Sequence, residues 1–179
     1  KAWETRMSGI RPDSDISEIA ALVSGALEQA GITAVLSGGA AVTIYTKNAY
    51  MSYDLDFVSS ESLERVEEIL SKLGFKRKNI RYFIHENTEF FIEFPPGPLA
   101  FGDKIDRDWA RLDTDAGVIQ IVTPTQCVMD RLAAYYHWND PQSLDQAIAV
   151  AISQDVDLGA VKDWSRLEGN TQKYERFQD

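Results

Sequence analysis

Two carboxylates stand two residues apart in the segment Asp54-Leu55-Asp56-Phe57-Val58. The alternation of polar and apolar residues predicts a half-buried strand, on which both carboxylates point to the same face. Because neighbouring carboxylates repel each other, a fold rarely places them side by side without a cation to bridge them. Hard divalent ions such as Mg²⁺ take oxygen ligands of this kind. We therefore predict that Asp54 and Asp56 are metal ligands.

A third acid lies on the later apolar segment Phe90-Phe91-Ile92-Glu93-Phe94. Glu86 and Glu89 lie close by, but the apolar neighbours of Glu93 favour it as the functional acid. Three acids from adjacent strands could hold two metal ions. Such a pair activates an attacking hydroxyl and stabilises the leaving oxygen in phosphoryl transfer.

A glycine pair could provide hydrogen-bond donors for an anion, which the carboxylates cannot provide. Ser37-Gly38-Gly39 follows a short apolar run, residues 33–36, and precedes a helical stretch from Ala40 to about Thr46. Two glycines between a strand and a helix N-terminus let backbone N–H groups approach an anion closely, helped by the helix dipole. A Gly-Gly pair alone is more often a tight turn. The order of glycine turn, helix, Asp-x-Asp strand and later acid is a much stronger indication of phosphate chemistry.

This ordered set resembles the minimal nucleotidyltransferase superfamily, which has the polymerase-β-like core. The matching residues are Val35-Leu36-Ser37-Gly38-Gly39, Asp54-Leu55-Asp56-Phe57 and Glu93, and the resemblance extends over about residues 14 to 152. Among the branches of that superfamily, the sequence is most similar to uncharacterised bacterial nucleotidyltransferase-like proteins and to AbiEii-type toxins of toxin–antitoxin systems.

The resemblance implies a fold, an activity and partners. The fold is α/β (α+β), a mixed sheet flanked by helices and followed by a C-terminal helical tail. The activity is transfer of a nucleotide from an NTP, bound with Mg²⁺ or Mn²⁺, to a hydroxyl of an RNA, tRNA included, or of a protein. A toxin of this kind would have an antitoxin partner.

The resemblance also assigns roles to individual residues. Asp54 and Asp56 would coordinate the metals, and Glu93 would be the third ligand or the base that takes the acceptor's proton. Asp140 could position a group near the same cleft. The nucleotide-binding positions that the resemblance implies are Ser37, Gly38, Gly39, Ser52 and Arg131.

One difference from the sequence pattern of this superfamily supports an alternative function. Relatives commonly carry an arginine where this chain has Tyr50, two residues before Ser52. The missing positive charge favours a second hypothesis, a catalytically degenerate binding or regulatory module on the same fold. A metal-dependent phosphohydrolase is a third and weaker one, because it needs more histidines or acids than the sequence places near the site.

The remaining elements follow from periodicity and from cap and turn residues. We divide the chain into an α/β core, residues 1–122, and a helical region, residues 123–179, with residues 1–12 as an arm before the first helix. The predicted helices run from a cap at Asp13 or Ser14 to Ala30, from Ser60 or Ser62 to Gly74, from Pro124, from Pro141 to Ile152 and from Leu158 to Leu167. The predicted later strands span residues 81–85, 90–94, 112–115 and 118–122.

Composition limits the classes of protein. The chain has 179 residues, a single cysteine and a net charge of −10, and 44% of its residues are hydrophobic, which excludes collagen-like and disordered classes. Its apolar runs are shorter than the ~20 residues that a membrane helix needs, and no signal peptide opens it, so we expect a cytoplasmic protein without membrane partners. The negative charge opposes indiscriminate nucleic-acid binding. One basic segment, Lys72 to Arg81, is the exception, and it makes an RNA acceptor more attractive.

Overall fold

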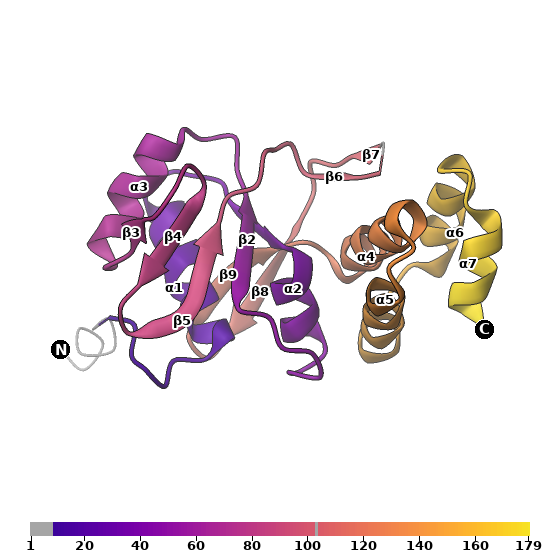
Figure 1. Cartoon of the computed structure of the whole chain (residues 1–179), viewed down its shortest axis with the longest axis horizontal. Coiled ribbons are helices and arrows are strands. Elements are labelled where there is room, and N and C mark those ends of the chain that lie inside the picture. Colours follow the sequence, from indigo (N-terminus) through magenta and orange to yellow (C-terminus); the bar gives the residue numbers. More distant parts are fainter. Residues whose placement is uncertain (1–8, 103) are drawn as a thin grey trace.

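The computed structural model describes residues 9–102 and 104–179, and its centre is a seven-stranded mixed sheet (Figure 1). The strand order is β3-β4-β5-β2-β1-β9-β8. β1 pairs in parallel with β9 and β2 with β5, whereas β1 and β2 are antiparallel. The strands of this sheet are β1 Val35–Ser37, β2 Asp54–Val58, β3 Lys76–Arg77, β4 Tyr82–His85, β5 Thr88–Glu93, β8 Ala110–Thr114 and β9 Gly117–Ile121. A separate two-stranded ribbon consists of β6 Ala100–Phe101 and β7 Lys104–Ile105.

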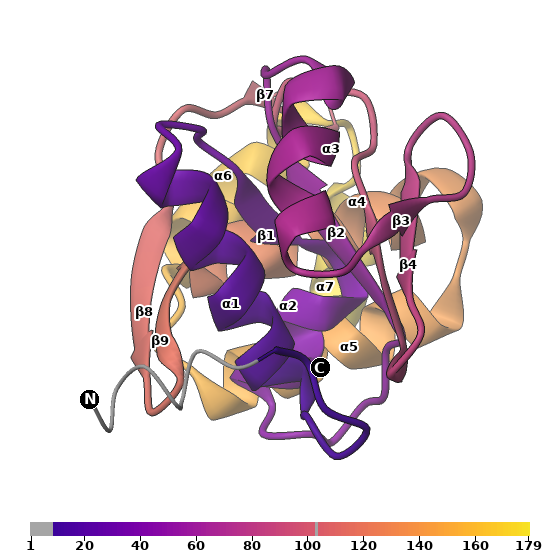
Figure 2. The ribbon, with the colours of Figure 1, turned by 90° about the vertical axis from the view of Figure 1, so that its left-hand side faces the viewer.

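Helices flank the sheet on both sides. α1 (Ile16–Gln29) and α3 (Leu63–Lys72) lie over the face seen in Figure 2. α2 (Gly38–Tyr45) lies on the opposite side and contacts β2 and α4 (Pro124–Trp138). α5 (Pro141–Ser153), α6 (Leu158–Leu167) and α7 (Thr171–Gln178) continue beyond α4 to the C-terminus (Figure 1). The arrangement is the mixed sheet with flanking helices that the sequence predicts.

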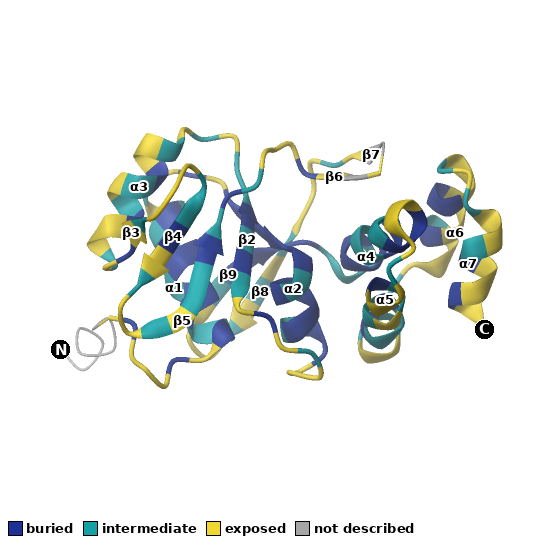
Figure 3. Cartoon of the chain, viewed as in Figure 1, coloured by how far each residue is buried: buried dark blue, intermediate teal, exposed yellow. Residues whose placement is uncertain are grey.

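Alternation along β2 separates the core from the functional face. Leu55 and Phe57 are completely buried, and the Phe57 ring stacks on Phe94 with 6.1 Å between ring centroids. Asp54 and Asp56 alternate with them along β2 and are only half-buried, and Figure 3 draws this strand partly in dark blue and partly in teal. Because successive side chains of a strand point to opposite faces, one face of β2 anchors the sheet and the other presents both carboxylates.

The helix caps agree with the sequence prediction at α3 and differ at α1. Ser62 caps α3 by accepting a hydrogen bond from the Arg65 N–H. The predicted cap of α1 at Asp13 or Ser14 is wrong, because Asp15 accepts from the Glu18 N–H. Ser14 instead is buried, and its Oγ accepts the Arg11 N–H at 3.0 Å.

Other differences concern short elements. α2 begins at Gly38 rather than at Ala40, so both glycines belong to its first turn. β3, β6 and β7 have two residues each, too few for periodicity to reveal them. α7 was not predicted either, although it buries Tyr174 and Phe177. Residues 1–8 of the predicted N-terminal arm lie outside the described residues, and residues 9–12 precede α1 as expected.

No described helix combines the length and the apolar character that crossing a membrane requires.

Candidate active site

The sheet register brings the three predicted acids together. Asp56 lies opposite Ser37 of β1 on one side and opposite Glu93 of β5 on the other. Asp54 lies one pleat further along the same face of β2. One carboxylate oxygen from each of Asp54, Asp56 and Glu93 lies within 4.8 Å of the others, and all three residues are half-buried. Residues that are 39 positions apart in sequence therefore form one acidic cluster.

The environment of Asp56 is unfavourable for its own charge. Burial, followed by the charges of Asp54 and Glu93, raises the pKa of Asp56 to about 7. Its Oδ1 atom is buried and has no hydrogen-bond partner among the described residues. An unpaired buried carboxylate oxygen is costly unless something compensates it. The cluster offers three hard oxygen donors, so the residues present fit a divalent metal ion.

The first turn of α2 lies directly against this cluster. Gly38 has a φ of +64°, and a Cβ atom there would lie 2.7 Å from Asp56 Oδ2. The Ser37 hydroxyl donates to the Asp56 carbonyl at 3.3 Å and does not cap α2. The first turn of α2 therefore lies beside the carboxylates and has no side-chain cap from Ser37, and the N–H groups at such a helix N-terminus can bind phosphate.

Ser52 orients one of the carboxylates. Its Oγ donates to Asp54 Oδ1 at 2.9 Å and lies against Gly39, where a Cβ atom would come within 3.1 Å of the hydroxyl. The contact fixes the Asp54 side chain relative to α2. Nucleotide binding by Ser52 stays a prediction.

Arg131 approaches the cluster from α4. Its guanidinium is bound by Asp130, with Nε at 3.0 Å from Oδ2, and Nη1 is 3.4 Å from Gln146 Oε1 of α5. Burial lowers the pKa of Arg131, but the Asp130 charge and hydrogen bond outweigh it and leave the pKa raised. The charge of Arg131 lowers the pKa of Asp56, whereas the charge of Asp130 raises it. A permanent cation thus stands beside the acids.

Asp130 is the member of this site that sequence reasoning missed. It directly precedes Arg131, and adjacent residues of a helix do not normally face each other. The signal that could have identified it is the Asp130-Arg131 pair itself, an acid beside the basic position that the resemblance selected.

Asp140 and the basic segment have structural partners. Asp140 is the N-cap of α5 and accepts from Ser143 Oγ at 2.6 Å and from the Gln142 N–H at 3.1 Å. The Ser143 hydroxyl is the main cause of the lowered pKa of Asp140. In the basic segment, Arg77 is bound to Glu67 at 3.0 Å, and Arg81 donates to the Phe94 carbonyl at 3.0 Å. Arg77 therefore links β3 to α3, and Arg81 binds the residue that follows β5.

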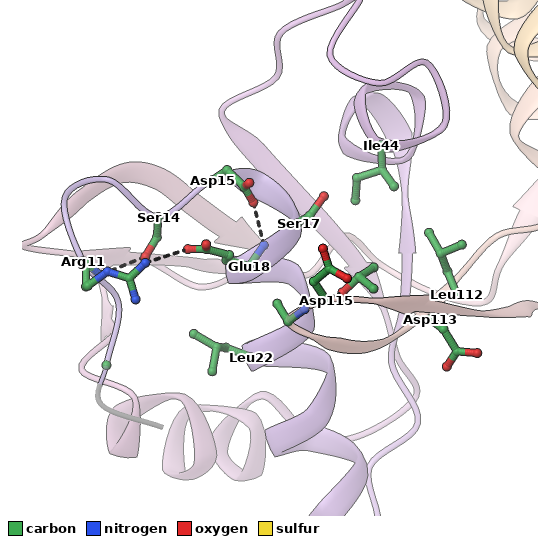
Figure 4. A pocket seen from close by; sticks show the side chains of 13 residues that line it. Arg11, Ser14, Asp15, Ser17, Glu18, Leu22, Ile44, Leu112, Asp113 and Asp115 are labelled. Carbon is green, nitrogen blue, oxygen red and sulfur yellow. Dashed lines mark hydrogen bonds and ion pairs between the residues drawn. The ribbon is translucent and has the colours of Figure 1, made fainter. Parts of the chain in front are cut away.

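An open cavity of about 800 Å³ lies between the start of α1 and the β8–β9 turn (Figure 4). Several of its polar side chains are engaged locally. Arg11 is bound to Asp13 and Glu18, and Asp15 caps α1. Asp54, Asp56 and Glu93 do not line this cavity.

Comparison with known proteins gives structural neighbours only. No family model matches the chain, and no curated protein matches it. A nucleotidyltransferase-like antigenic protein of Paracoccidioides brasiliensis superposes with a TM-score of 0.56 at 12% identity, over 77% of this chain and 76% of that one. The chain has a nucleotidyltransferase-like fold. Two structures of the antibiotic-resistance factor ANT(2'')-Ia extend the likeness to most of the chain. The solution structure has a TM-score of 0.52 at 13% identity, covering 92% of this chain and 97% of that one.

The other ANT(2'')-Ia structure is a complex with adenylyl-2''-tobramycin, and its TM-score is 0.53 at 13% identity, over 92% of this chain and 98% of that one. At such low identity the three likenesses establish the fold, which confirms the fold predicted from the motif residues. These structures include no AbiEii-type toxin, so that branch stays a prediction.

Proposed function

We propose that this protein is a metal-dependent nucleotidyltransferase, which moves a nucleoside monophosphate from an NTP to an acceptor hydroxyl. The observation that best supports the proposal is the cluster of Asp54, Asp56 and Glu93 against the first turn of α2, with an unpaired buried oxygen on Asp56. Three acids beside a helix N-terminus provide ligands for a metal ion that is bound to a triphosphate. A structural ion pair needs one acid and one base, so it does not account for three acids at one place.

Each residue has a distinct task in this proposal. The N–H groups at Gly38 and Gly39 bind phosphate oxygens, and the Arg131 guanidinium neutralises part of the triphosphate charge. Asp54, Asp56 and Glu93 would hold Mg²⁺ or Mn²⁺. A bound metal of this kind supplies charge stabilisation to the transferring phosphoryl group. Ser52 keeps Asp54 oriented, and Asp130 holds Arg131. A carboxylate of the cluster, Glu93 in our assignment, accepts the proton of the acceptor hydroxyl.

The chemical class of the acceptor is a separate question from the transfer reaction. ANT(2'')-Ia is known in complex with a nucleotidylated small molecule, adenylyl-2''-tobramycin. By analogy we favour a small-molecule hydroxyl over the RNA or protein hydroxyl that the sequence resemblance suggests. The basic segment makes an RNA acceptor more attractive, but two of its arginines, Arg77 and Arg81, are engaged within the fold. A toxin with an antitoxin partner remains the alternative that an RNA or protein product would support.

A transfer assay tests the proposal. The protein is incubated with each of the four NTPs, labelled at the α-phosphate, with Mg²⁺ or Mn²⁺ and one of three acceptors: total tRNA, the protein itself, or a pool of hydroxylated small molecules that includes tobramycin. We expect label in one class of product, with loss of that label in Asp54→Asn. Glu89→Gln is the matched control, because Glu89 is an exposed acid of the same strand as Glu93.

A degenerate module would give a different result. Tyr50 stands where relatives have a basic residue, so triphosphate affinity could have been lost. In that case no NTP would bind in a metal-dependent manner and no acceptor would be labelled. Transfer that survives Asp54→Asn would contradict the proposed site rather than the fold.

A further inference from the structure

An open cavity of about 770 Å³ lies at the end of the strands that carry the acids. Its wall includes Val35 of β1, Val58 of β2 and Pro95, which follows β5. Val35 and Val58 are paired across β1 and β2, one pleat from the Ser37–Asp56 pair on the same face of the sheet. Pro95 lies two residues beyond Glu93. The cavity therefore begins about 7 Å along the strands from the carboxylates.

Along the strands, Asp56 lies between this cavity and the first turn of α2. Along β1 the order is Val35, then Ser37 opposite Asp56, then Gly38 at the start of α2. Along β2 the order is reversed, from Ser52 near Gly39 to Val58 at the cavity. The first turn of α2, where we propose that phosphate binds, and the cavity thus lie on opposite sides of Asp56 along the strand direction.

The geometry of phosphoryl transfer relates the two sides of Asp56 to the attacking and the leaving oxygen. In an in-line displacement the attacking oxygen and the leaving oxygen lie on opposite sides of the phosphorus. In the proposed function pyrophosphate leaves toward the N-terminus of α2, and the acceptor then approaches from the opposite side, which is the side of Val35 and Val58. The nucleoside is attached to an equatorial oxygen, roughly perpendicular to the line of attack. A cavity that lies along the line of attack is therefore better placed for the acceptor than for the nucleobase.

The lining indicates the chemistry of its occupant. The walls are apolar and aromatic, and the indole of Trp109 is held by a hydrogen bond from Nε1 to Gln120 Oε1 at 2.8 Å. Two cations, Arg81 and Arg107, line the same space. Planar rings bind well against such walls, and guanidinium groups bind carboxylates.

The two acids of the lining are engaged by donors of the chain itself. Glu61 is bound to Arg65 at 3.0 Å. Asp106 accepts the backbone N–H groups of Arg107 and Asp108 through Oδ1. Arg81 also donates to the Phe94 carbonyl through Nη1, so Arg107 is the charged group of the lining that is best placed to meet a ligand, in a protein whose net charge is −10.

From these observations we infer that this cavity is the acceptor site, and that the acceptor is a small hydroxylated molecule with a planar apolar body and an anionic group. The inference rests on the proposed function and narrows it. The acceptor oxygen forms a bond to the α-phosphorus as the bond from that phosphorus to the pyrophosphate oxygen breaks. Pyrophosphate leaves with the electron pair, and the hydroxyl proton passes to the carboxylate cluster. A polycation such as tobramycin would be repelled by Arg81 and Arg107.

A fluorescent anion tests the site without any need for turnover. The probe is 8-anilinonaphthalene-1-sulfonate, an anion with a planar naphthalene ring and an apolar body, titrated into the intact chain in the presence and absence of the four NTPs with Mn²⁺. We expect saturable binding that Arg107→Glu weakens about tenfold, since a favourable charge contact becomes repulsive. Arg166→Glu is the matched control, because Arg166 is an exposed arginine of α6 outside the cavity, and it leaves the affinity unchanged.

Three results would overturn the inference. Binding insensitive to Arg107→Glu would show that the probe does not use this cavity. Displacement of the probe by NTPs would make the cavity a nucleobase site. Competition by tobramycin would contradict the anionic class. Nucleotide binding, followed separately as an NTP-dependent rise in Tm, reports on the proposed function, so failure of the acceptor site and failure of the nucleotidyltransferase proposal are distinguishable.

A transfer assay gives the second arm of the test. Hydroxyphenyl carboxylic acids and tobramycin are compared as acceptors of labelled nucleotide. We expect label in an acid, and Arg107→Glu should raise KM for that acid while KM for the NTP stays unchanged. Label in tobramycin but in none of the acids would contradict the inference.

Discussion

Gly38 and Asp56 are in such close contact that a Cβ atom on Gly38 would lie 2.7 Å from Asp56 Oδ2. The glycine also has a φ of +64°, which costs other residues about 1–2 kcal/mol. The absence of a side chain at this position thus allows the backbone of α2 to lie against a carboxylate. The contact links the glycine motif to the acid motif in three dimensions.

Gly38→Ala is expected to destabilise the protein by about 1–3 kcal/mol, from backbone strain and from the clash with Asp56. It should also weaken nucleotide binding, because the first turn of α2 must move. Gly25→Ala is the matched control. Gly25 lies within α1, where an added Cβ meets nothing within 4 Å, so alanine should stabilise the chain by about 0.5–1 kcal/mol. Urea unfolding measures both. Equal stability of the two variants would contradict the contact.

Asp56→Asn is expected to stabilise the metal-free protein, because it removes a buried charge that two neighbouring acids repel. A gain of about 1–2 kcal/mol corresponds to about 3–6 °C in Tm for a chain of this size. Metal-dependent nucleotide binding should be lost in the same variant. A decrease in Tm in the presence of EDTA would contradict the account.

The stability of the wild type should also depend on pH through Asp56. The pKa of Asp56 is raised from 3.8 to about 7, so the folded protein binds this proton more tightly than the unfolded chain. The contribution of protonated Asp56 to stability is therefore complete below pH 4 and is lost as the pH rises through 7. With EDTA present, the difference in Tm between Asp56→Asn and wild type should increase from pH 5 to pH 8. Asp115→Asn, at an exposed turn position, should not show this trend.

Arg131→Gln is expected to weaken NTP binding at least several-fold, because it removes the cation that faces the acids. Asp130→Asn should have a smaller effect on NTP affinity and should lower the stability, since Arg131 loses the carboxylate that binds it. Calorimetric titration and urea unfolding separate the two effects. Unchanged NTP affinity in Arg131→Gln would show that Arg131 does not bind the NTP.

Asp140→Ala is expected to cost about 1 kcal/mol of stability, through loss of the α5 N-cap. The increase in Tm on adding NTP and metal should stay as in the wild type. A loss of nucleotide binding without a loss of stability would instead support the role near the cleft that the resemblance suggested for Asp140.

The sequence predicted the part of the site that lies on strands and in the glycine motif. A period of two places Asp54 and Asp56 on one face, and the apolar surroundings select Glu93 over Glu89. The sequence could not indicate that β1, β2 and β5 are neighbours, because register depends on contacts between distant segments. Only the resemblance implied it.

The remaining features arise from tertiary packing. Asp130 matters because α4 lies close enough for it to act on Asp56, and no local pattern encodes that distance. The engagement of Arg81 by the Phe94 carbonyl was equally invisible in a run of basic residues. The two-residue strands β6 and β7 lie in the segment from 99 to 110, where neither helical nor strand periodicity extends far enough to be recognised.

Thermal unfolding with each NTP, with Mg²⁺ or Mn²⁺ and with EDTA, tests the central claim most directly. A ligand at about 100 times its Kd stabilises the folded state by roughly 2.7 kcal/mol. The account predicts an increase in Tm that needs both NTP and metal and that Asp54→Asn/Asp56→Asn abolishes, each variant being compared with its own ligand-free Tm. A wild-type Tm that no NTP raises, or an increase of equal size in the double variant, would contradict it.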